Sequence, residues 1–521
     1  MRAATWLPPG ATGRWAWPVT LTAILAMAAV LRFHDLLARG TWDADQGHDM
    51  LLLRALVADG RLPLLGPPTS IGDFHHGALY YYLLAPAAFL GGGDPTAVVA
   101  EIALLGVTAV ALVAGLARRL AGPAAGVAAG IVIAVSGSAV DESTFIWNPN
   151  LIAFSSALAV AAAWHAWSTG RARWWIVAAA GQAITMQCHV LGWTLLPPLG
   201  AWLVVDARRR TGGERRRVLA AGLGGLLLIA ATYVPLVASE LQTGFHETRA
   251  AIAFLAGGGQ ATAPDPLLRI VFVSLRIVAW PLTGLLTAAL AAGVFAAVGA
   301  LALVAWRVRA ATPPERTLVR WIAATIAWSW LVLGLGVSSL ASVTPLPVDH
   351  YHAFLDPLVV LGIGFGAGGL WHVVGRARVP GRLGAVAVVA ALVAWNVTHQ
   401  PPSVAPDGGY PAALAAAGRI AGLVDGRGGR IVSLPPFKAP DAYVYPLVRV
   451  GASISSFPAG LPDAASPGAL IVLCDDLFVA DCGGPAEDAV AAAGPGSELA
   501  LADRFRPAPG RTISVYLAAG P

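Results

Sequence analysis

The chain has 521 residues, of which 57% are hydrophobic and only 12% are charged, and its formal net charge is +5. Its mean hydropathy is +0.68. Because a soluble domain carries roughly 25% charged residues, this composition excludes a soluble enzyme, a coiled coil and a disordered chain, and it indicates an integral membrane protein. The basic residues occur as short arginine clusters, with Lys438 as the single lysine, and they do not form one continuous basic face. We therefore expect no nucleic-acid partner.

Apolar stretches long enough to cross a bilayer recur between residues 15 and 397 and are missing from the last 124 residues. The sequence therefore predicts a mainly α, polytopic helical bundle over residues 1–397, followed by a separate domain over 398–521. A helix needs about 20 apolar residues to cross, and on that basis we predict about eleven spans, near 15–33, 96–117, 123–140, 151–167, 174–188, 190–205, 218–237, 281–306, 321–341, 353–372 and 383–397.

The arginine clusters predict the orientation of these spans. Short cytoplasmic loops collect Arg and Lys, and with the amino terminus in the cytoplasm every cluster falls on the cytoplasmic side: 118–119, 171–173, 208–217, 307–320 and 376–382. This holds only if the segments 75–92 and 267–280 do not cross, so we predict that both are interfacial helices on the outer side. We expect a multi-pass protein of the cell membrane, in contact with its lipids.

An odd number of spans places the carboxyl-terminal segment outside the cytoplasm. After a proline-rich linker it contains a helical pattern, LAAAGRIAGLV, and the short β-type runs RIVSL, ALIVLC and TISVYLA, which predict a small α/β domain. Cys474 and Cys482 lie in this domain. In an oxidising compartment they could form a disulfide, and two free thiols are an equal alternative.

Polar residues are densest in the first outer loop, residues 34–95. If a helix starts near Asp45, then His48 and Asp49 lie one turn further along the same face, and Gly60 is suited to end that helix. This loop is the best candidate for a site, with Asp43, Asp45 and Asp49 as its acids. Each of them has an alternative role as a cap or a partner of the helix dipole.

Other outer loops contribute polar residues that one cavity could gather. They are Asp141 and Asn148 in DESTFIWNPN, His189 between two close spans, and His350 and His352 in VDHYHAF. Structural alternatives exist for these residues: Asn148 with Pro149 forms an ordinary turn, and histidines beside Tyr351 are common at an interface.

Two sequence blocks resemble the GT-C superfamily of membrane glycosyltransferases. WDADQGHDMLLLRALVADGRLPLLGPPTS, followed by HHGALYYYLLAP, is similar to the first outer loop of the bacterial branch that includes the lipid A aminoarabinose transferase and the protein O-mannosyltransferases. FIWNPN and DHYHAFLDPL extend the resemblance across roughly residues 15–400. It implies transfer of one sugar, with inversion, from a polyprenyl-phosphate donor to a glycan, lipid or protein acceptor outside the cytoplasm.

The resemblance also implies roles for individual residues. An acid after the first span, usually in an Asp-Glu pair, is catalytic in that family, and Asp45 with Gln46 occupies its place, which leaves open whether Asp43 or Asp49 is the second carboxylate. The family's phosphate-binding basic residue corresponds to His76, before Gly77. We expect His75 and Arg54 to assist it, and Tyr81 either to contact sugar or to anchor its helix.

The required chemistry agrees with these residue types. A sugar phosphate already has a good leaving group, so the reaction needs a base for the acceptor hydroxyl and positive charge for the departing phosphate. We expect no cofactor. A divalent metal is a minor alternative, since His75 with His76 and His350 with His352 lack the four-residue spacing of a helical zinc pair. The main alternative function is a transporter or lipid flippase, although the centres of the spans carry few charges.

Overall fold

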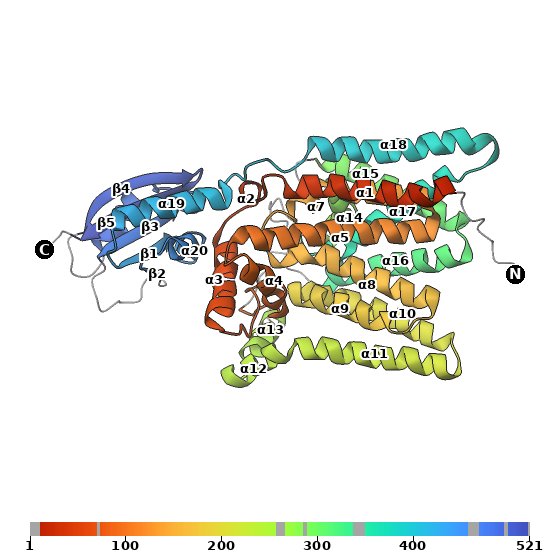
Figure 1. Ribbon diagram of the computed structural model, residues 1–521, viewed down its shortest axis with the longest axis horizontal. Coiled ribbons are helices and arrows are strands. Elements are labelled where there is room, and N and C mark those ends of the chain that lie inside the picture. Colours follow the sequence, from red (N-terminus) through yellow and green to blue (C-terminus); the bar gives the residue numbers. More distant parts are fainter. Residues whose placement is uncertain are drawn as a thin grey trace.

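The computed structural model describes residues 11–69, 73–256, 266–284, 289–336, 350–456, 468–493 and 499–518. It has a long bundle of roughly parallel helices with a smaller mixed domain at one end (Figure 1). This end of the bundle also carries the short helices of the first loop, so the predicted site region lies where the two parts meet. The mainly α fold with a small α/β domain is thus confirmed.

The bundle contains long apolar helices that correspond to the predicted spans. Their bounds are α1 Ala11–Phe33, α5 Pro95–Ala121, α6 Pro123–Val135, α8 Ile152–Thr169, α9 Trp174–Cys188, α10 Leu196–Arg208, α11 Gly212–Thr232, α12 Val234–Thr243, α15 Leu290–Ala310, α16 Pro313–Leu331, α17 Asp356–Trp371 and α18 Arg378–Thr398. Within the described ranges, 8 helices are long and apolar enough to cross a membrane, or 9 if α11 and α12, bent by 43°, form one span. The protein is therefore a multi-pass membrane protein, but the predicted number of spans is not confirmed.

Several predicted boundaries were wrong for local reasons. The span expected at 123–140 ends at Val135, because Ser136 begins the separate short helix α7, Gly137–Asp141, whose amino end it caps. The span expected at 281–306 begins at Leu290, since residues 281–283 complete α14, Pro266–Thr283. Beyond Leu331 the span expected at 321–341 continues as a π-helical turn to Gly336, and its last residues lie outside the described ranges.

Small residues let the central helices of the bundle approach closely. A Cβ placed on Gly364 of α17 would lie 2.6 Å from the Cβ of Ala129 on α6, and one on Gly368 would lie 2.7 Å from that of Ala125. Close packing of this kind is how apolar helices associate in a membrane, where burial from water offers little driving force.

The short helices at the domain end of the bundle include α2 Leu36–Arg39, α3 Ala44–Asp59, α4 Leu79–Leu90 and α13 His246–Ala256. Helix α3 runs across the ends of the long helices rather than along them (Figure 1). At 12 residues, α4 is too short to cross, in agreement with the interfacial helix predicted for 75–92.

The carboxyl-terminal domain is built on a five-stranded sheet in the order β2-β1-β3-β5-β4. Strands β1, β2 and β3 are parallel, and β5 and β4 are antiparallel to their neighbours. The strands are β1 Gly429–Leu434, β2 Ile454–Ser456, β3 Ala469–Asp475, β4 Leu499–Ala508 and β5 Arg511–Ala518, and the helices are α19 Gly409–Val424, α20 Asp441–Arg449 and α21 Pro485–Ala492. Helix α20 packs on α3 and α19 on α2, so the domain is seated on the first loop. Cys474 and Cys482 form a disulfide.

Candidate active site

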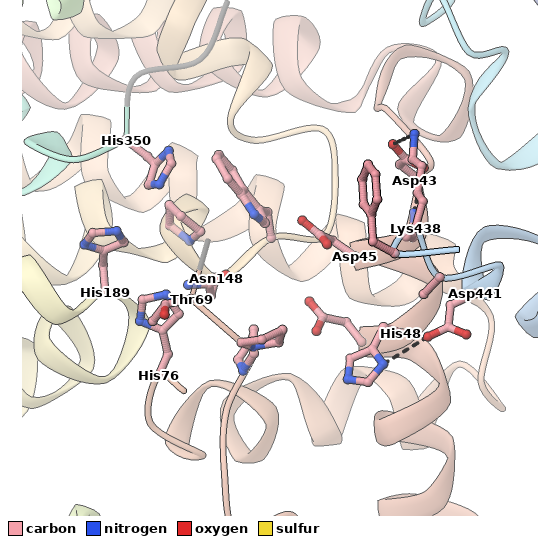
Figure 2. A pocket seen from close by; sticks show the side chains of 18 of the residues that line it. Asp43, Asp45, His48, Thr69, His76, Asn148, His189, His350, Lys438 and Asp441 are labelled. Atoms are coloured by element: carbon pink, nitrogen blue, oxygen red, sulfur yellow. Dashed lines mark hydrogen bonds and ion pairs between the residues drawn. The ribbon is translucent and has the colours of Figure 1, made fainter. Parts of the chain in front are cut away.

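A cavity of about 510 Å³ lies between the first loop, the ends of the bundle and the carboxyl-terminal domain (Figure 2). It is lined by residues from six sequence-distant segments: 43–49, 67–69 with His76, 147–149, His189, His350, and from the domain Phe437, Lys438, Ala439, Asp441 and Phe478. One end carries the histidines and the other the carboxylates, with Asp45 between them (Figure 2).

Helix α3 fixes the positions of the acids. Asp43 is its N-cap and forms a reciprocal capping box with Gln46, whose Oε1 accepts the Asp43 N–H at 2.9 Å. The Gln46 amide also donates to the carbonyl of Ile146 at 2.9 Å, which ties the start of α3 to the bundle. Gly60 ends the helix with a φ of 68°. Gln46, which stands where the resembling family has glutamate, therefore has a structural role here.

The three acids of α3 have different surroundings. Asp43 is paired with Lys438 at 3.3 Å and with Arg511 at 2.9 Å. Asp49 is buried and accepts hydrogen bonds from the hydroxyls of Tyr80 and Tyr81 at 2.8 and 2.7 Å. Asp45 has neither a hydrogen bond nor an ion pair within the described part of the chain, and its side chain is exposed to the cavity.

The environment raises the pKa of both Asp45 and Asp49. For Asp45 the main cause is desolvation by the surrounding protein, followed by the negative charge of Asp43, while His48 and Lys438 act in the opposite direction. Burial raises the pKa of Asp49 to about 7, despite the two tyrosine hydroxyls that favour its ionised form. A carboxylate that is open to a cavity and has a raised pKa is a suitable general base.

The opposite end of the cavity has little charge. The rings of His76 and His189 lie 5.1 Å apart, as do those of His189 and His350, and Trp147 packs at 4.4 Å on His350. Burial lowers the pKa of His76 to about 3, with a smaller effect from His350 and His75, so this imidazole is neutral at physiological pH. Its Nδ1 is buried with no hydrogen-bond partner among the described residues, so its hydrogen-bonding capacity is unused.

The carboxyl-terminal domain closes the cavity on the carboxylate side. Asp441 accepts a hydrogen bond from His48 at 3.0 Å, and Lys438 pairs with Asp475 of β3 as well as with Asp43. A Cβ on Gly47 would lie 2.0 Å from the carbonyl oxygen of Asp441, so only glycine allows α20 to sit this close to α3.

Of the predicted site residues, the structure brings seven to the cavity wall: Asp43, Asp45, Asp49, His76, Asn148, His189 and His350. Five others lie elsewhere. His75 does not line the cavity, and its backbone N–H donates to Glu247 at 2.7 Å. Arg54 is exposed and does not line the cavity either. Tyr81 is fully buried against Asp49, which leaves no ring face for a sugar.

Asp141 and His352 are the remaining two. Asp141 is the last residue of α7, where it interacts electrostatically with Arg39. His352 is 3% exposed, with its Nδ1 3.6 Å from a carboxylate oxygen of Asp356. Neither residue lines the cavity.

Sequence patterns did not predict any of the cavity residues that the carboxyl-terminal domain contributes. Lys438, Asp441, Phe437 and Phe478 are separated from the first loop by more than 340 residues, and no local pattern connects the two. The one available signal was that Lys438 is the only lysine of a chain rich in arginine. The described residues contain no group of three or more His, Cys, Asp or Glu side chains arranged to hold a metal ion.

Comparisons with known proteins give the fold context. A family model described as dolichyl-phosphate-mannose-protein mannosyltransferase matches residues 75–234. The crystal structure of ArnT from Cupriavidus metallidurans bound to undecaprenyl phosphate superposes with a TM-score of 0.63 at 14% identity, covering 98% of this chain and 100% of that one. The chain has the GT-C fold. The apo form of the same ArnT gives 0.61 at 15% identity, with the same coverage.

The GT-C resemblance extends to a second class of enzyme. An oligosaccharyltransferase from Archaeoglobus fulgidus in complex with Zn and sulfate superposes with a TM-score of 0.50 at 15% identity, covering 92% of this chain and 70% of that one. A search among curated proteins found no significant match. The resemblance predicted from the first loop is confirmed by the match to the family model and by the ArnT fold over nearly the full chain.

Proposed function

We propose that the protein is a membrane glycosyltransferase that moves a single sugar from a polyprenyl-phosphate donor to an acceptor on the extracytoplasmic side. The observation that carries this proposal is the state of Asp45. It is the one acid of α3 that is open to the cavity and free of a partner within the described residues, whereas Asp43 and Asp49 are engaged.

The donor class is supported by both the comparisons and the chemistry. The matching family model is named for dolichyl-phosphate mannose, and one ArnT structure holds undecaprenyl phosphate. In a polyprenyl-phosphate donor the phosphate is already a good leaving group, so the reaction needs no strong acid. It does need a base for the acceptor hydroxyl, and the cavity has an available one in Asp45. The arginine clusters favour a cytoplasmic amino terminus, and this orientation supports a cavity that opens outside the cytoplasm.

In the proposed reaction, the acceptor hydroxyl attacks the anomeric carbon while Asp45 takes its proton. A new glycosidic C–O bond forms, the bond between the anomeric carbon and the phosphate oxygen breaks, and the polyprenyl phosphate leaves with the electron pair. The sugar lies over Asp45, with the phosphate toward the histidines, because the cations at the other end, Lys438 and Arg511, are already paired with acids.

At that end, the ring of His76, which lines the cavity and whose Nδ1 has no partner among the described residues, would contact the phosphate oxygens. A phosphate in contact with His76 would itself raise the pKa of this histidine and so strengthen the hydrogen bond. His76 is therefore proposed as a donor-binding residue rather than a fixed cation.

The test replaces Asp45 by Asn, which keeps the shape of the side chain and removes the base. Purified protein is incubated with a panel of radiolabelled polyprenyl-phosphate sugars and membrane acceptors, and transferred and released sugar are measured. We expect the D45N variant to lose about 100-fold or more of kcat and to keep its affinity for the donor. Asp59→Asn is the matched control, because Asp59 is an exposed acid of the same helix.

Two results would contradict the proposal. The first is full turnover by D45N. The second is solute movement across proteoliposomes without cleavage of a donor bond by the wild-type protein, which would favour a transporter.

A further inference from the structure

The carboxyl-terminal domain places its only ammonium group in the wall of the proposed transferase cavity. The Nζ atom of Lys438 lies 3.3 Å from Asp43, is also paired with Asp475, and is only 20% exposed. Asp43 precedes Asp45 by two residues, and Asp45 lies between the Asp43–Lys438 pair and the histidines (Figure 2). The proposed sugar transfer does not involve this lysine directly.

The charges around Lys438 balance only while it is present. Two acids, Asp43 and Asp475, face two bases, Lys438 and Arg511, and all four are at most 38% exposed. Loss of the lysine would leave one uncompensated negative charge beside Asp45. In a partly desolvated site such a charge disfavours a second carboxylate nearby.

We propose that Lys438 is a positioning residue of the transferase site: its ammonium group, held between Asp43 and Asp475, keeps Asp45 in the carboxylate form that accepts the proton. The inference rests on the proposed function. It makes the carboxyl-terminal domain a part of the catalytic machinery rather than a separate acceptor-binding module.

The electrostatics of Asp45 point the same way. Desolvation and Asp43 raise the pKa of Asp45, and His48 and Lys438 lower it. The groups that face Asp45 come from every element around it, so Lys438 is one of several contributions. They are Asp43, His48 and Asp49 on α3, Tyr81 on α4, Lys438, Asp441 and Arg511 from the domain, and His76, His189 and His350 across the cavity.

A purely structural role for Lys438 in holding the domain has less support. The domain has other contacts with the first loop: Arg511 with Asp43, His48 with Asp441, and the Trp42 indole N–H, which donates to the carbonyl of Ala442 at 2.7 Å. These contacts do not involve the lysine, so we expect the domain to stay docked in its absence.

The protonation of Asp45 can be measured without any substrate. A hydrophobic carbodiimide reacts with protonated carboxyl groups, and peptide mass spectrometry of the full-length protein in nanodiscs reports the labelled fraction of Asp45 at each pH. We expect Lys438→Gln to move the midpoint up by about 0.5–1 pH unit and Lys438→Arg to leave it in place. The double variant Asp43→Asn, Lys438→Gln should return it toward the wild-type value, and its new asparagine would still cap α3.

Arg449→Gln is the matched control for domain docking. Arg449 donates to the carbonyl of Gly92 at 2.7 Å, another contact between a domain cation and the bundle, but it does not line the cavity. This variant should leave the midpoint unchanged. An unchanged midpoint in Lys438→Gln, or an equal shift in Arg449→Gln, would overturn the proposal.

Because the chain has one lysine, the wild-type protein provides a second measurement that does not depend on folding of a variant. Acetylation of the folded protein removes the charge of Lys438, and reductive dimethylation keeps it. The Lys438→Arg protein, treated in the same way, controls for the amino terminus. Acetylation alone should raise the Asp45 midpoint, and equal midpoints after both treatments would contradict the inference.

The outcomes also separate this inference from the proposed function. If the wild-type protein transfers sugar but Lys438→Gln has the wild-type midpoint, only the role of Lys438 fails. If the midpoint shifts but no donor is cleaved, the transferase function fails and the electrostatic coupling remains. If the wild-type protein transfers sugar and the Asp45 midpoint shifts in Lys438→Gln, sugar transfer by this variant should decline at low pH and recover at high pH.

Discussion

The two ends of the cavity use polar residues in opposite ways. At the histidine end, His76, His189 and His350 are packed against each other and against Trp147, and burial favours the neutral forms of His76 and His189. At the carboxylate end, acids and bases are paired across the contact between α3 and the carboxyl-terminal domain. The first end therefore offers neutral hydrogen-bonding groups to a ligand, and the second a balanced set of charges around one carboxylate that is open to the cavity.

Residues of the same type in one loop therefore have different chemical properties, because each is surrounded by different neighbours. Asp43, Asp45 and Asp49 lie within about two turns of the same helix, yet one is salt-bridged, one is open and one is buried between tyrosines. Experiments that disturb one end at a time can test whether the two ends act independently.

Apart from loss of the base itself in Asp45→Asn, the largest effect is expected from Gly47→Ala, which disturbs the carboxylate end. The new Cβ would lie 2.0 Å from the backbone carbonyl oxygen of Asp441. No side-chain rotation can relieve this overlap, so the whole of α20 must shift and carry Lys438 and Asp441 away from α3. Because the overlap is with backbone, we expect a cost at the upper end of the roughly 1–3 kcal/mol of an overpacked contact. Sugar transfer should therefore fall by about 100-fold, and the 399–408 linker should become more sensitive to protease.

Gly418→Ala is the control for this change. Gly418 lies in α19 of the same domain, and its added Cβ meets nothing within 4 Å. Wild-type transfer by Gly47→Ala would mean that the carboxylate end functions without close docking of the domain.

An intermediate effect is expected from His76→Ala at the histidine end. Loss of one hydrogen bond to a charged phosphate, worth about 1.5–3 kcal/mol, should raise KM for the polyprenyl-phosphate donor by about 10-fold or more and change kcat less. His75→Ala is the control, since His75 faces Glu247 outside the cavity. A fall in kcat with no change in KM, measured by steady-state kinetics, would contradict the assignment of donor binding to the histidine end.

The smallest effect is expected from Asp49→Asn, measured as thermal stability against pH. The pKa of Asp49 is about 7 in the folded protein and about 3.9 in an unfolded chain. The folded state therefore binds this proton more tightly, so the stability contribution is largest below about pH 4 and is lost as pH rises toward about 7.

We expect the melting temperature of Asp49→Asn to exceed that of the wild-type protein by a few degrees at pH 8 and the gap to shrink at pH 5. Differential scanning fluorimetry in detergent would detect this, with Asp59→Asn as the exposed control. A gap of the same size at both pH values would show that Asp49 is ionised in the folded protein.

Local sequence patterns determined much of the architecture. Long apolar runs predicted the helices of the bundle, and the spacing of Asp43, Gln46 and Gly60 agrees with the cap, capping box and end of α3. The three β-type runs of the carboxyl-terminal segment became β1, β3 and β5. These features depend on hydrophobic periodicity and on hydrogen bonds within a few residues, so they are readable from neighbouring positions.

Only the tertiary structure decided how the acids divide their roles and which residues complete the cavity. The burial of Asp49, the pairing of Asp43 and the placement of Lys438 and Asp441 depend on tertiary packing, above all on the docking of α20 against α3, two helices that are far apart in the sequence. Burial and charge pairing are properties of the folded environment rather than of residue type. The sequence could therefore name Asp45 as a candidate, and the fold alone showed why its two neighbouring acids are not free to act.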